Sequence, residues 1–270
     1  MNGSIENNSK GWALILGASS GFGAASATAL ADAGFNIFGV HLDRRATIAN
    51  AERVAGEIRN KGREALFFNA NAADAERRAE ITQACRETLS RNNDESGIRL
   101  FLHSLAFGTL KPYIGTEPGT GIKPSDMNMT LDVMAHSFVY WTQELMAANL
   151  LGKGAKLFAM TSAGSHKVWP TYGAVSAAKA ALEAHVRQLA VELAPFGIAV
   201  NALQAGVADT PAARRIPGSD RMFDQALKTN PGGRLTTPED VGILLSALAV
   251  CESSWMTGTI LKIDGGEDMV

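Results

Sequence analysis

The chain has 270 residues, a formal net charge of −2 at pH 7 and a pI near 6.2. This length suits one α/β domain as well as two smaller ones, and a chain of this size can bury a core without disulfides. The near-neutral charge does not favour nucleic acid or an anionic membrane as a partner. The two cysteines are far apart in the sequence, so we expect no disulfide and a reducing, cytoplasmic environment.

The sequence indicates neither a membrane span nor a metal site. The longest apolar run, residues 241–251, is too short to cross a bilayer and is predicted to be a buried helix. Residues 1–10 are polar and rich in asparagine, which predicts a flexible tail rather than a signal peptide. The five histidines form no i, i+4 pair and no cluster with cysteine, so no metal is predicted.

Short apolar runs alternate with longer helical patterns along the chain. The predicted strands are residues 12–16, 36–42, 65–69, 100–103, 156–160, 199–203 and 259–263. The predicted helices between them include residues 24–33, 48–60, 74–89, 131–149 and 174–192. This alternation predicts an α/β fold, with a single Rossmann-type, doubly wound parallel sheet of about seven strands and helices on both faces. No break in composition divides residues 11–270, which are predicted to form one dinucleotide-binding catalytic domain.

Two longer connections interrupt the alternation. Residues 107–127 contain four glycines and three prolines and are predicted to be a loop. Residues 207–233 are also interrupted by proline and glycine but contain a short helical piece at 221–228. A long connection in a compact domain is usually functional, so we expect 207–233 to be a substrate lid. Its residues Met222 and Phe223 either pack on substrate or anchor the lid to the core.

A glycine-rich stretch follows the first predicted strand and opens the first helix. Glycines there allow a tight turn and let the helix N-terminus approach the pyrophosphate of a dinucleotide. The predicted cofactor loop consists of Gly17, Ser19, Ser20, Gly21, Phe22 and Gly23. Asn71 and Ala72, after the third predicted strand, are assigned to the adenine end of the same cofactor.

The end of the second predicted strand should select between NAD(H) and NADP(H). A carboxylate there favours a free 2′-hydroxyl, whereas positive charge favours a 2′-phosphate. His41 stands where a selecting aspartate is expected, Asp43 comes two residues later, and Arg44 and Arg45 follow. These residues favour NADP(H) as cofactor, with His41 and Arg44 in contact, and do not exclude NAD(H). The two arginines can equally be solvent-exposed residues at the start of the next helix, with no role in cofactor binding.

A tyrosine and a lysine stand at the start of an alanine-rich helical run. Tyr172 and Lys179 are seven residues apart, which is two helical turns or about 10 Å of rise, so their side chains share one face. A phenol and an ammonium so placed can form an acid site, in which the lysine lowers the phenol's pKa and binds a sugar hydroxyl. Taken alone, the pair can also be a solvated lysine and a packed aromatic edge.

Three further motifs extend this pattern, namely Val200-Asn201-Ala202, Ala205-Gly206-x3-Thr210 and Ile263-Asp264-Gly265-Gly266. Together with the glycine loop and the Tyr172/Lys179 helix, they resemble the short-chain dehydrogenase/reductase family over nearly the whole chain. The resemblance implies a nicotinamide cofactor and a homotetramer. The further cofactor contacts that it implies are Ser104, Leu105, Ala106, Lys179, Gly206, Ala208 and Thr210.

The spacing of tyrosine and lysine is typical of one branch of that family. Ordinary members have Tyr-x3-Lys, but here that position is Val175, which cannot act as an acid. Tyr172-x6-Lys179 resembles the enoyl-acyl-carrier-protein reductases, to which residues 103–107 and 132–138 are also similar. The glycine loop, however, has the ordinary spacing. Ser162 replaces a second tyrosine of the branch and stands where ordinary members have a catalytic serine, so it is either catalytic or a cap at a strand end.

The resemblance implies NAD(P)H-dependent reduction of the 2,3 double bond of an enoyl thioester, of the fatty-acid synthesis type, on acyl carrier protein or coenzyme A. The catalytic candidates are Tyr172, Lys179 and Ser162, and the substrate candidates are Phe107, Tyr172, Met222 and Phe223. The main alternative is a carbonyl reductase, 3-oxoacyl reductase or alcohol dehydrogenase of the same fold. A non-catalytic nucleotide-binding protein is a third interpretation, disfavoured because both Tyr172 and Lys179 are present.

Overall fold

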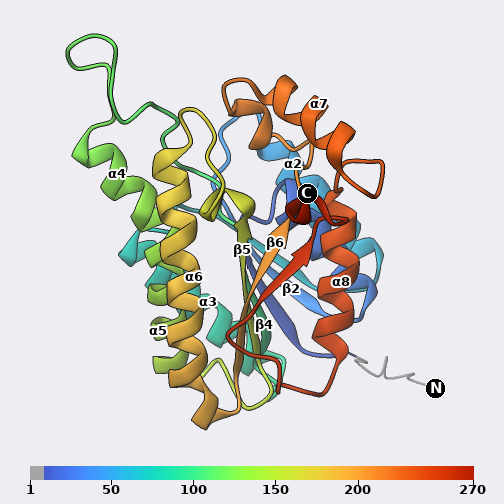
Figure 1. Ribbon diagram of the computed structural model, residues 1–270. Helices are drawn as coiled ribbons and strands as arrows, with labels where there is room; N and C mark the ends of the chain where they lie inside the picture. Colours follow the sequence, from blue (N-terminus) through green and yellow to red (C-terminus); the bar gives the residue numbers. More distant parts are fainter. Residues whose placement is uncertain (1–8) are drawn as a thin grey trace.

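The computed structural model describes residues 9–270 and shows the layered α/β architecture expected from the sequence (Figure 1). Seven parallel strands form one sheet in the order β3-β2-β1-β4-β5-β6-β7. The strands are β1 (Trp12–Leu16), β2 (Asn36–His41), β3 (Ala65–Asn69), β4 (Ile98–His103), β5 (Lys156–Ser162), β6 (Ala199–Ala205) and β7 (Ile260–Ile263). The predicted doubly wound parallel sheet is confirmed.

Helices cover both faces of this sheet. One layer contains α1 (Gly21–Asp32), α2 (Ile48–Asn60) and α8 (Pro238–Val250). The other contains α3 (Ala75–Arg91), α5 (Ser137–Ala147) and α6 (Gly173–Leu193). The remaining helices, α4 (Pro124–Leu131) and α7 (Ser219–Thr229), belong to the two long connections.

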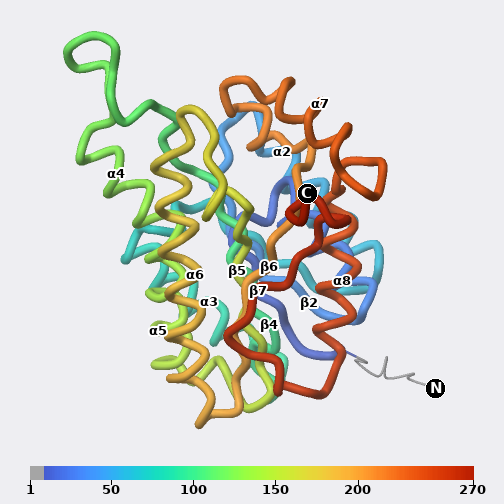
Figure 2. Tube along the Cα trace, viewed as in Figure 1, coloured from blue at the N-terminus to red at the C-terminus, as the bar shows by residue number. Residues whose placement is uncertain are grey.

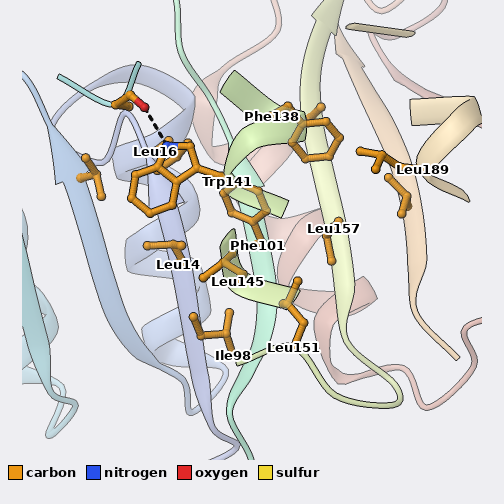
Figure 3. Close-up of a cluster of buried hydrophobic side chains, with 14 of the residues drawn as sticks. Leu14, Leu16, Ile98, Phe101, Phe138, Trp141, Leu145, Leu151, Leu157 and Leu189 are labelled. Atoms are coloured by element: carbon orange, nitrogen blue, oxygen red, sulfur yellow. Dashed lines mark hydrogen bonds between the residues drawn. The ribbon is translucent and has the colours of Figure 1, made fainter. Parts of the chain in front are cut away.

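Strand β1 is buried between the two layers. Leu14 and Leu16 belong to the core beneath α3, α5 and α6, whereas Ala13 and Ile15 belong to the core beneath α1, α2 and α8. All four side chains are fully buried, because successive side chains of a strand point to opposite faces and both faces are covered. Figure 3 shows the first core, where the Trp141 indole donates a hydrogen bond of 2.8 Å to a backbone carbonyl.

The stretch predicted as one helix, residues 131–149, contains a change of helix type. It comprises the end of α4, a π-helical turn over Asp132–His136 and then α5. The Ser137 hydroxyl donates to the Val133 carbonyl at 2.7 Å within this turn. Such turns occur often at functional sites, and this one lies beside the candidate active site described below.

Two other boundaries differ from the prediction. The loop expected at 107–127 ends early because α4 begins at Pro124, and proline suits a first helical position whose N–H would have no partner. The apolar run 241–251 forms most of α8, which packs on α1 but is not fully buried, since Ile243 is 66% exposed. Within residues 9–270, no helix is long and apolar enough to cross a bilayer.

The tail expected at residues 1–10 lies outside the described residues except for its last two. The Lys10 N–H donates to the Gly34 carbonyl at 3.0 Å, and the Asn36 side chain donates to Ser9 Oγ at 3.1 Å. Both residues are therefore attached to the start of β2.

The strand order determines where a ligand can bind. Strands β1 and β4 are neighbours, but the chain leaves β1 toward β2 and later returns to the other side through β4. In open α/β sheets, ligands bind at the carboxyl ends of the strands beside such a reversal. The connection after β4 and helix α7 lie at this end, on either side of the β5–α6 connection (Figure 2).

Candidate active site

The glycine loop between β1 and α1 has a conformation that depends on glycine. Gly17 has a φ of 87°, and Gly21 has a φ of 54°. A Cβ at Gly17 would lie 2.3 Å from the Ser104 carbonyl oxygen, and a Cβ at Gly23 would lie 2.1 Å from that of Gly17. The first turn of α1, all of it described, has no acidic side chain, so its N–H groups and dipole suit a phosphate. The loop therefore fits the pyrophosphate of a dinucleotide.

The loops that follow β4 and β6 border the glycine loop. The Thr210 side chain lies 3.7 Å from the place of a Cβ on Gly21, and the Leu105 side chain lies 3.8 Å from that of a Cβ on Gly17. The other cofactor candidates in these two loops are Ser104, Ala106, Gly206 and Ala208. Three loops that are distant in the sequence thus meet at one edge of the sheet.

The Asp43 carboxylate reaches back toward the glycine loop. It contacts Nδ1 of the buried His41 at 2.8 Å. Burial tends to raise the pKa of Asp43, but hydrogen bonds from Thr47, Ser19 and His41 prevail and lower it. The two arginines that follow Asp43 are exposed. An ionised carboxylate beside the loop is an arrangement that can receive ribose hydroxyls.

The two candidates for the adenine end differ in accessibility. Asn71 is exposed, and its side-chain oxygen accepts the Ala73 N–H at 3.1 Å. Ala72 is buried, and its carbonyl accepts the Trp141 indole N–H at 2.8 Å. Asn71 is therefore available to a ligand, whereas Ala72 is buried and its carbonyl is already hydrogen-bonded within the core.

The Tyr172 ring lies against the short turn Ala163–Ser165 that follows β5. A Cβ at Gly164 would lie 2.6 Å from Tyr172 Cε1 and 3.1 Å from Ser162 Oγ. Burial raises the pKa of Tyr172, and the nearby Ser162 hydroxyl lowers it by less. Among the described residues, Ser162 Oγ has no hydrogen bond of ordinary geometry, so its effect on the phenol is a weak one. The phenol is protonated at neutral pH.

Lys179 lies further along α6 and points to strand β5. Its Nζ donates to the Met160 carbonyl at 2.6 Å. Burial lowers the pKa of Lys179 to about 8, and the charge of Glu183 opposes this shift. The expectation that Lys179 lowers the pKa of Tyr172 is wrong, because burial of the phenol dominates and raises it.

The position one helical turn after Tyr172 is closed. Val175 is 4% exposed, and its Cγ2 lies 2.8 Å from the place of a Cβ on Gly108. A larger side chain at either residue would collide with the other. The structure therefore leaves Tyr172 as the acid candidate on this part of α6.

His103, at the end of β4, is a buried neutral histidine. Its Nε2 lies 2.8 Å from Ser137 Oγ. Because the Ser137 hydroxyl donates to the Val133 carbonyl, it accepts from Nε2–H of His103. Burial, and then the charge of Lys179, lower the pKa of His103 to about 3. This histidine supports the site but carries no charge at neutral pH.

Two features of the site were missed by sequence reasoning. Thr171 has a φ of 65°, which is unusual for a β-branched residue, and its hydroxyl has no hydrogen-bond partner among residues 9–270. Tyr113, from the loop after β4, packs on the start of α6, where a Cβ at Gly173 would lie 2.6 Å from Tyr113 Cζ. The glycine next to the candidate acid is the one signal that could have indicated this close contact.

The remaining substrate candidates lie in the segments that flank Tyr172. Phe107 is 52% exposed in the loop after β4, and Met222 and Phe223 are partly exposed in α7. The Trp169 indole donates to the Pro217 carbonyl at 3.2 Å, which joins the β5–α6 connection to the residues before α7. Both segments therefore present apolar side chains at the end of the sheet that holds the candidate acid.

Known proteins share both the sequence pattern and the fold. The family model described as enoyl-(acyl carrier protein) reductase matches residues 17–267. The chain is 32% identical over 170 residues to the enoyl-[acyl-carrier-protein] reductase [NADH] FabI of Aquifex aeolicus. That match covers 62% of this chain and spans 61% of the relative's length.

Two solved structures have a closely similar fold. The enoyl-[acyl-carrier-protein] reductase (NADH) from Aquifex aeolicus has a TM-score of 0.80 at 22% identity, with 98% of each chain covered. A 3-oxoacyl-[acyl-carrier protein] reductase from Brucella melitensis, in complex with NAD, has a TM-score of 0.79 at 24% identity, covering 96% of this chain and 97% of that one. The fold alone therefore does not separate the two reactions.

The family assignment rests on the match to residues 17–267 and agrees with the Tyr-x6-Lys spacing. The chain belongs to the short-chain dehydrogenase/reductase family of nicotinamide-dependent oxidoreductases, in the branch described as enoyl-(acyl carrier protein) reductase.

Proposed function

We propose that the protein reduces the 2,3 double bond of an enoyl thioester of the kind formed in fatty-acid synthesis. The observation that carries the proposal is the position and protonation of Tyr172. It is a protonated phenol at the start of α6, whereas Val175 fills the position one turn later. The acid of this site is therefore displaced by one helical turn from the place that a carbonyl-reducing member uses.

This displacement suits the chemistry of an enoyl thioester. In ketone reduction, negative charge develops on the oxygen of the carbon that receives hydride. In enoyl reduction, the charged thioester oxygen lies two carbons further away. An acid placed one turn earlier on the helix suits that displaced oxygen.

The residues divide the work as follows. The bound cofactor supplies the hydride, and the protein orients the reactants and stabilises charge. Tyr172 donates a hydrogen bond to the thioester oxygen, and its raised pKa keeps the proton in place until charge develops. A donor of this type contributes about 2.7–4 kcal/mol to the transition state. Lys179 uses one N–H on Met160 and keeps two donors, which suit the hydroxyls of the nicotinamide ribose.

We infer NADH rather than NADPH as the preferred cofactor. The ionised Asp43 carboxylate beside Ser19 would repel a 2′-phosphate and accept from a free 2′-hydroxyl. The name of the Aquifex aeolicus relative also specifies NADH. The preference for NADP(H) drawn from Arg44 and Arg45 finds no support in this arrangement.

The substrate carrier and the assembly are further parts of the proposal. Phe107, Met222 and Phe223 would contact the acyl chain, with 207–233 as the lid, and the thioester would be on acyl carrier protein or coenzyme A. A homotetramer is supported by exposed apolar residues, including Ile243 on α8 and Trp255. The cytoplasm fits a chain whose two cysteines, Cys85 and the exposed Cys251, are free.

The test is consumption of NADH and NADPH, followed separately, with a crotonyl thioester and a 3-ketoacyl thioester. We expect NADH oxidation with the crotonyl substrate. Oxidation with the ketoacyl substrate alone would establish the second candidate function, 3-oxoacyl reduction, which the position of Ser162 beside the Tyr172 ring favours. It would also overturn the interpretation of the Tyr-x6-Lys spacing.

Replacing the phenol hydroxyl tests the role of Tyr172 directly. In Tyr172→Phe, kcat with crotonyl thioester should fall roughly 100- to 1000-fold while NADH affinity is unchanged, because one oxyanion donor is lost. Tyr140→Phe, on α5 away from the Gly164 turn, is the matched control and should retain kcat. A loss of less than about tenfold in Tyr172→Phe contradicts the assigned role.

A further inference from the structure

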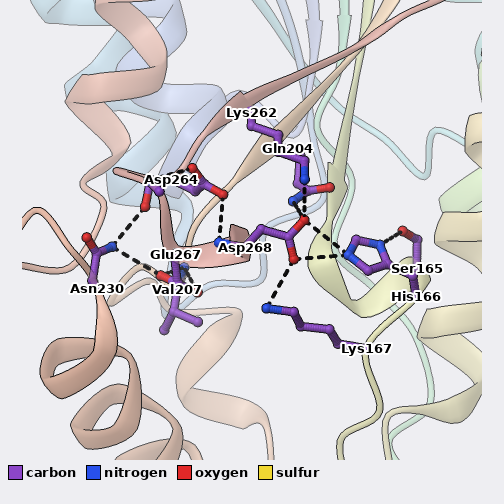
Figure 4. Close-up of polar contacts among 11 residues, drawn as sticks. Ser165, His166, Lys167, Gln204, Val207, Asn230, Lys262, Asp264, Glu267 and Asp268 are labelled. Carbon is purple, nitrogen blue, oxygen red and sulfur yellow. Dashed lines mark hydrogen bonds and ion pairs between the residues drawn. The ribbon is translucent and has the colours of Figure 1, made fainter. Parts of the chain in front are cut away.

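A carboxylate near the C-terminus collects four donors from three parts of the fold (Figure 4). Asp268 lies in the short turn Glu267–Met269, and its side chain is 3% exposed. It accepts from His166 Nε2 at 3.0 Å, Lys167 Nζ at 3.1 Å, Gln204 Nε2 at 3.0 Å and Lys262 Nζ at 2.6 Å. Two of these donors come from the connection between β5 and α6, and the other two come from strands β6 and β7.

The two donors from the β5–α6 connection lead directly to the candidate acid. His166 and Lys167 donate their backbone N–H groups to the Ala163 carbonyl at 3.1 and 2.7 Å. The His166 ring is also 3.0 Å from Ser165 Oγ, so it is held between Ser165 and Asp268. These bonds hold the turn Ala163–Ser165, whose Gly164 faces the Tyr172 ring as described above.

The same C-terminal segment also contacts the cofactor side of the site. The Glu267 carboxylate accepts the Val207 N–H at 3.1 Å, next to the cofactor candidate Gly206. Asp264 accepts the backbone N–H groups of Gly266 at 2.9 Å and Asp268 at 3.1 Å, which fixes the shape of the turn. The segment therefore contacts both the loop of the candidate acid and the loop that holds the cofactor candidate Gly206.

We propose that Asp268 is a positioning residue, which holds the Ala163–Ser165 turn against Tyr172 and so orients the phenol toward the reacting oxygen. This inference rests on the proposed function for its effect on turnover. Its physical basis is that Gly164 leaves no space between the turn and the ring, so movement of the turn moves the phenol. A displacement of about 1 Å at a reacting group can lower a rate about 100-fold.

The contacts of Asp268 with different parts of the fold can be removed separately, which allows a matched experiment. Asp268→Ala removes all four contacts, and the pair His166→Ala/Lys167→Met removes the two contacts between Asp268 and the acid's loop, together with the contact between His166 and Ser165. Lys262→Met is the control, since Lys262 is on β7 and its loss removes an ion pair with the same carboxylate without touching the acid's loop. We expect the first two variants to lower kcat about tenfold or more, with NADH affinity unchanged and Lys262→Met close to wild type.

Two readouts separate positioning from a general loss of stability. In a Tyr172→Phe background, adding Asp268→Ala should cause little further loss, because the group it orients is already absent. Hydrogen exchange of residues 163–172 should be faster in the first two variants than in Lys262→Met. If Asp268→Ala does not fold, the exposed pair His166/Lys167 carries the test alone.

Three results would overturn the proposal. They are a wild-type kcat in His166→Ala/Lys167→Met, a loss of kcat in Lys262→Met equal to that in Asp268→Ala, or losses of kcat in Asp268→Ala and Tyr172→Phe that are fully additive. Failure of the proposed function looks different, because wild-type protein would then not reduce the crotonyl thioester. In that case exchange at residues 163–172 still decides whether Asp268 holds the turn, and unchanged exchange would refute it.

Discussion

Thr171 precedes the candidate acid in a strained backbone conformation. A β-branched residue at a φ of 65° pays a conformational cost, and the residue's hydroxyl is buried without a partner among the described residues. Asparagine tolerates this conformation better than threonine. The strain is thus located next to Tyr172, at the start of α6.

Relieving this strain should stabilise the protein. We expect Thr171→Asn to raise the free energy of unfolding by about 1 kcal/mol in urea denaturation. Thr171→Val is the matched control, since it keeps a β-branched side chain at positive φ and replaces only the hydroxyl, by a methyl group. An equal gain in both variants would attribute the cost to the buried hydroxyl instead of the backbone.

Lys179 gives the enzyme a predictable response to pH. Its pKa of about 8 means that about a tenth of the molecules keep the ammonium at pH 9. If this charge binds the ribose and supports turnover, kcat/KM should decline as pH rises through 8. In Lys179→Met, activity should be low and without this decline, and a flat wild-type profile up to pH 9 would contradict the role.

The effect of the same group on stability has the opposite sign. The folded-state pKa is lower than in the unfolded chain, so the unfolded chain binds more protons between the two values. This contribution to stability is present at high pH and is lost as pH falls through 8. Thermal denaturation measured alongside the kinetics therefore separates loss of the charge from unfolding.

At the scale of elements, helices α1 and α8 cross where neither can hold a larger side chain. A Cβ at Gly242 in α8 would lie 2.9 Å from the Ala25 carbonyl oxygen and 3.2 Å from Ala29 Cβ. Gly56 in α2 is the opposite case, because a Cβ there meets nothing within 4 Å. An alanine at Gly56 would change only helix propensity, whereas an alanine at Gly242 would change both propensity and packing, so the two positions distinguish the two effects.

Replacing each glycine by alanine should change stability in opposite directions. Gly242→Ala is expected to destabilise by about 1–3 kcal/mol, since overpacking exceeds the gain in helix propensity. Gly56→Ala should stabilise by about 0.5–1 kcal/mol, because only the propensity changes. Urea denaturation of both variants measures this, and stabilisation by Gly242→Ala would mean that the helices can move apart.

At the scale of the whole molecule, the cofactor site is assembled from loops on both sides of the strand reversal. The glycine loop follows β1, Ser104 and Leu105 follow β4, and Thr210 follows β6. A ligand bound there contacts both halves of the sheet. We therefore propose that residues 11–270 unfold as one cooperative unit.

The effect of NADH on unfolding tests whether residues 11–270 unfold as one cooperative unit. At a concentration of about 100 times its Kd, NADH should raise the free energy of unfolding by about 2.7 kcal/mol in a single transition. Gly23→Ala should abolish the effect, because its Cβ would lie 2.1 Å from the Gly17 carbonyl oxygen, whereas Gly56→Ala should retain it. Two transitions, of which NADH moves only one, would contradict a single unit.

The sequence by itself determined the fold class and the family. Hydrophobic runs of strand length alternating with amphipathic stretches predict the parallel sheet. The helices were predicted less accurately: one begins at Pro124 inside a glycine- and proline-rich segment, and another predicted helix contains the π-helical turn Asp132–His136. Spacing also predicts that the glycine loop, Tyr172 and Lys179 belong to the site, because they lie close together in the sequence or on one helix.

Only the tertiary structure decided how these residues behave. The pKa of Tyr172 is raised because other segments bury the phenol, whereas spacing alone suggested a decrease. The Asp43 carboxylate lies beside Ser19 of the glycine loop, and Asp268 reaches the acid's loop through His166 and Lys167. Burial and electrostatics depend on neighbours that are distant along the chain, so they follow from packing and not from local sequence patterns.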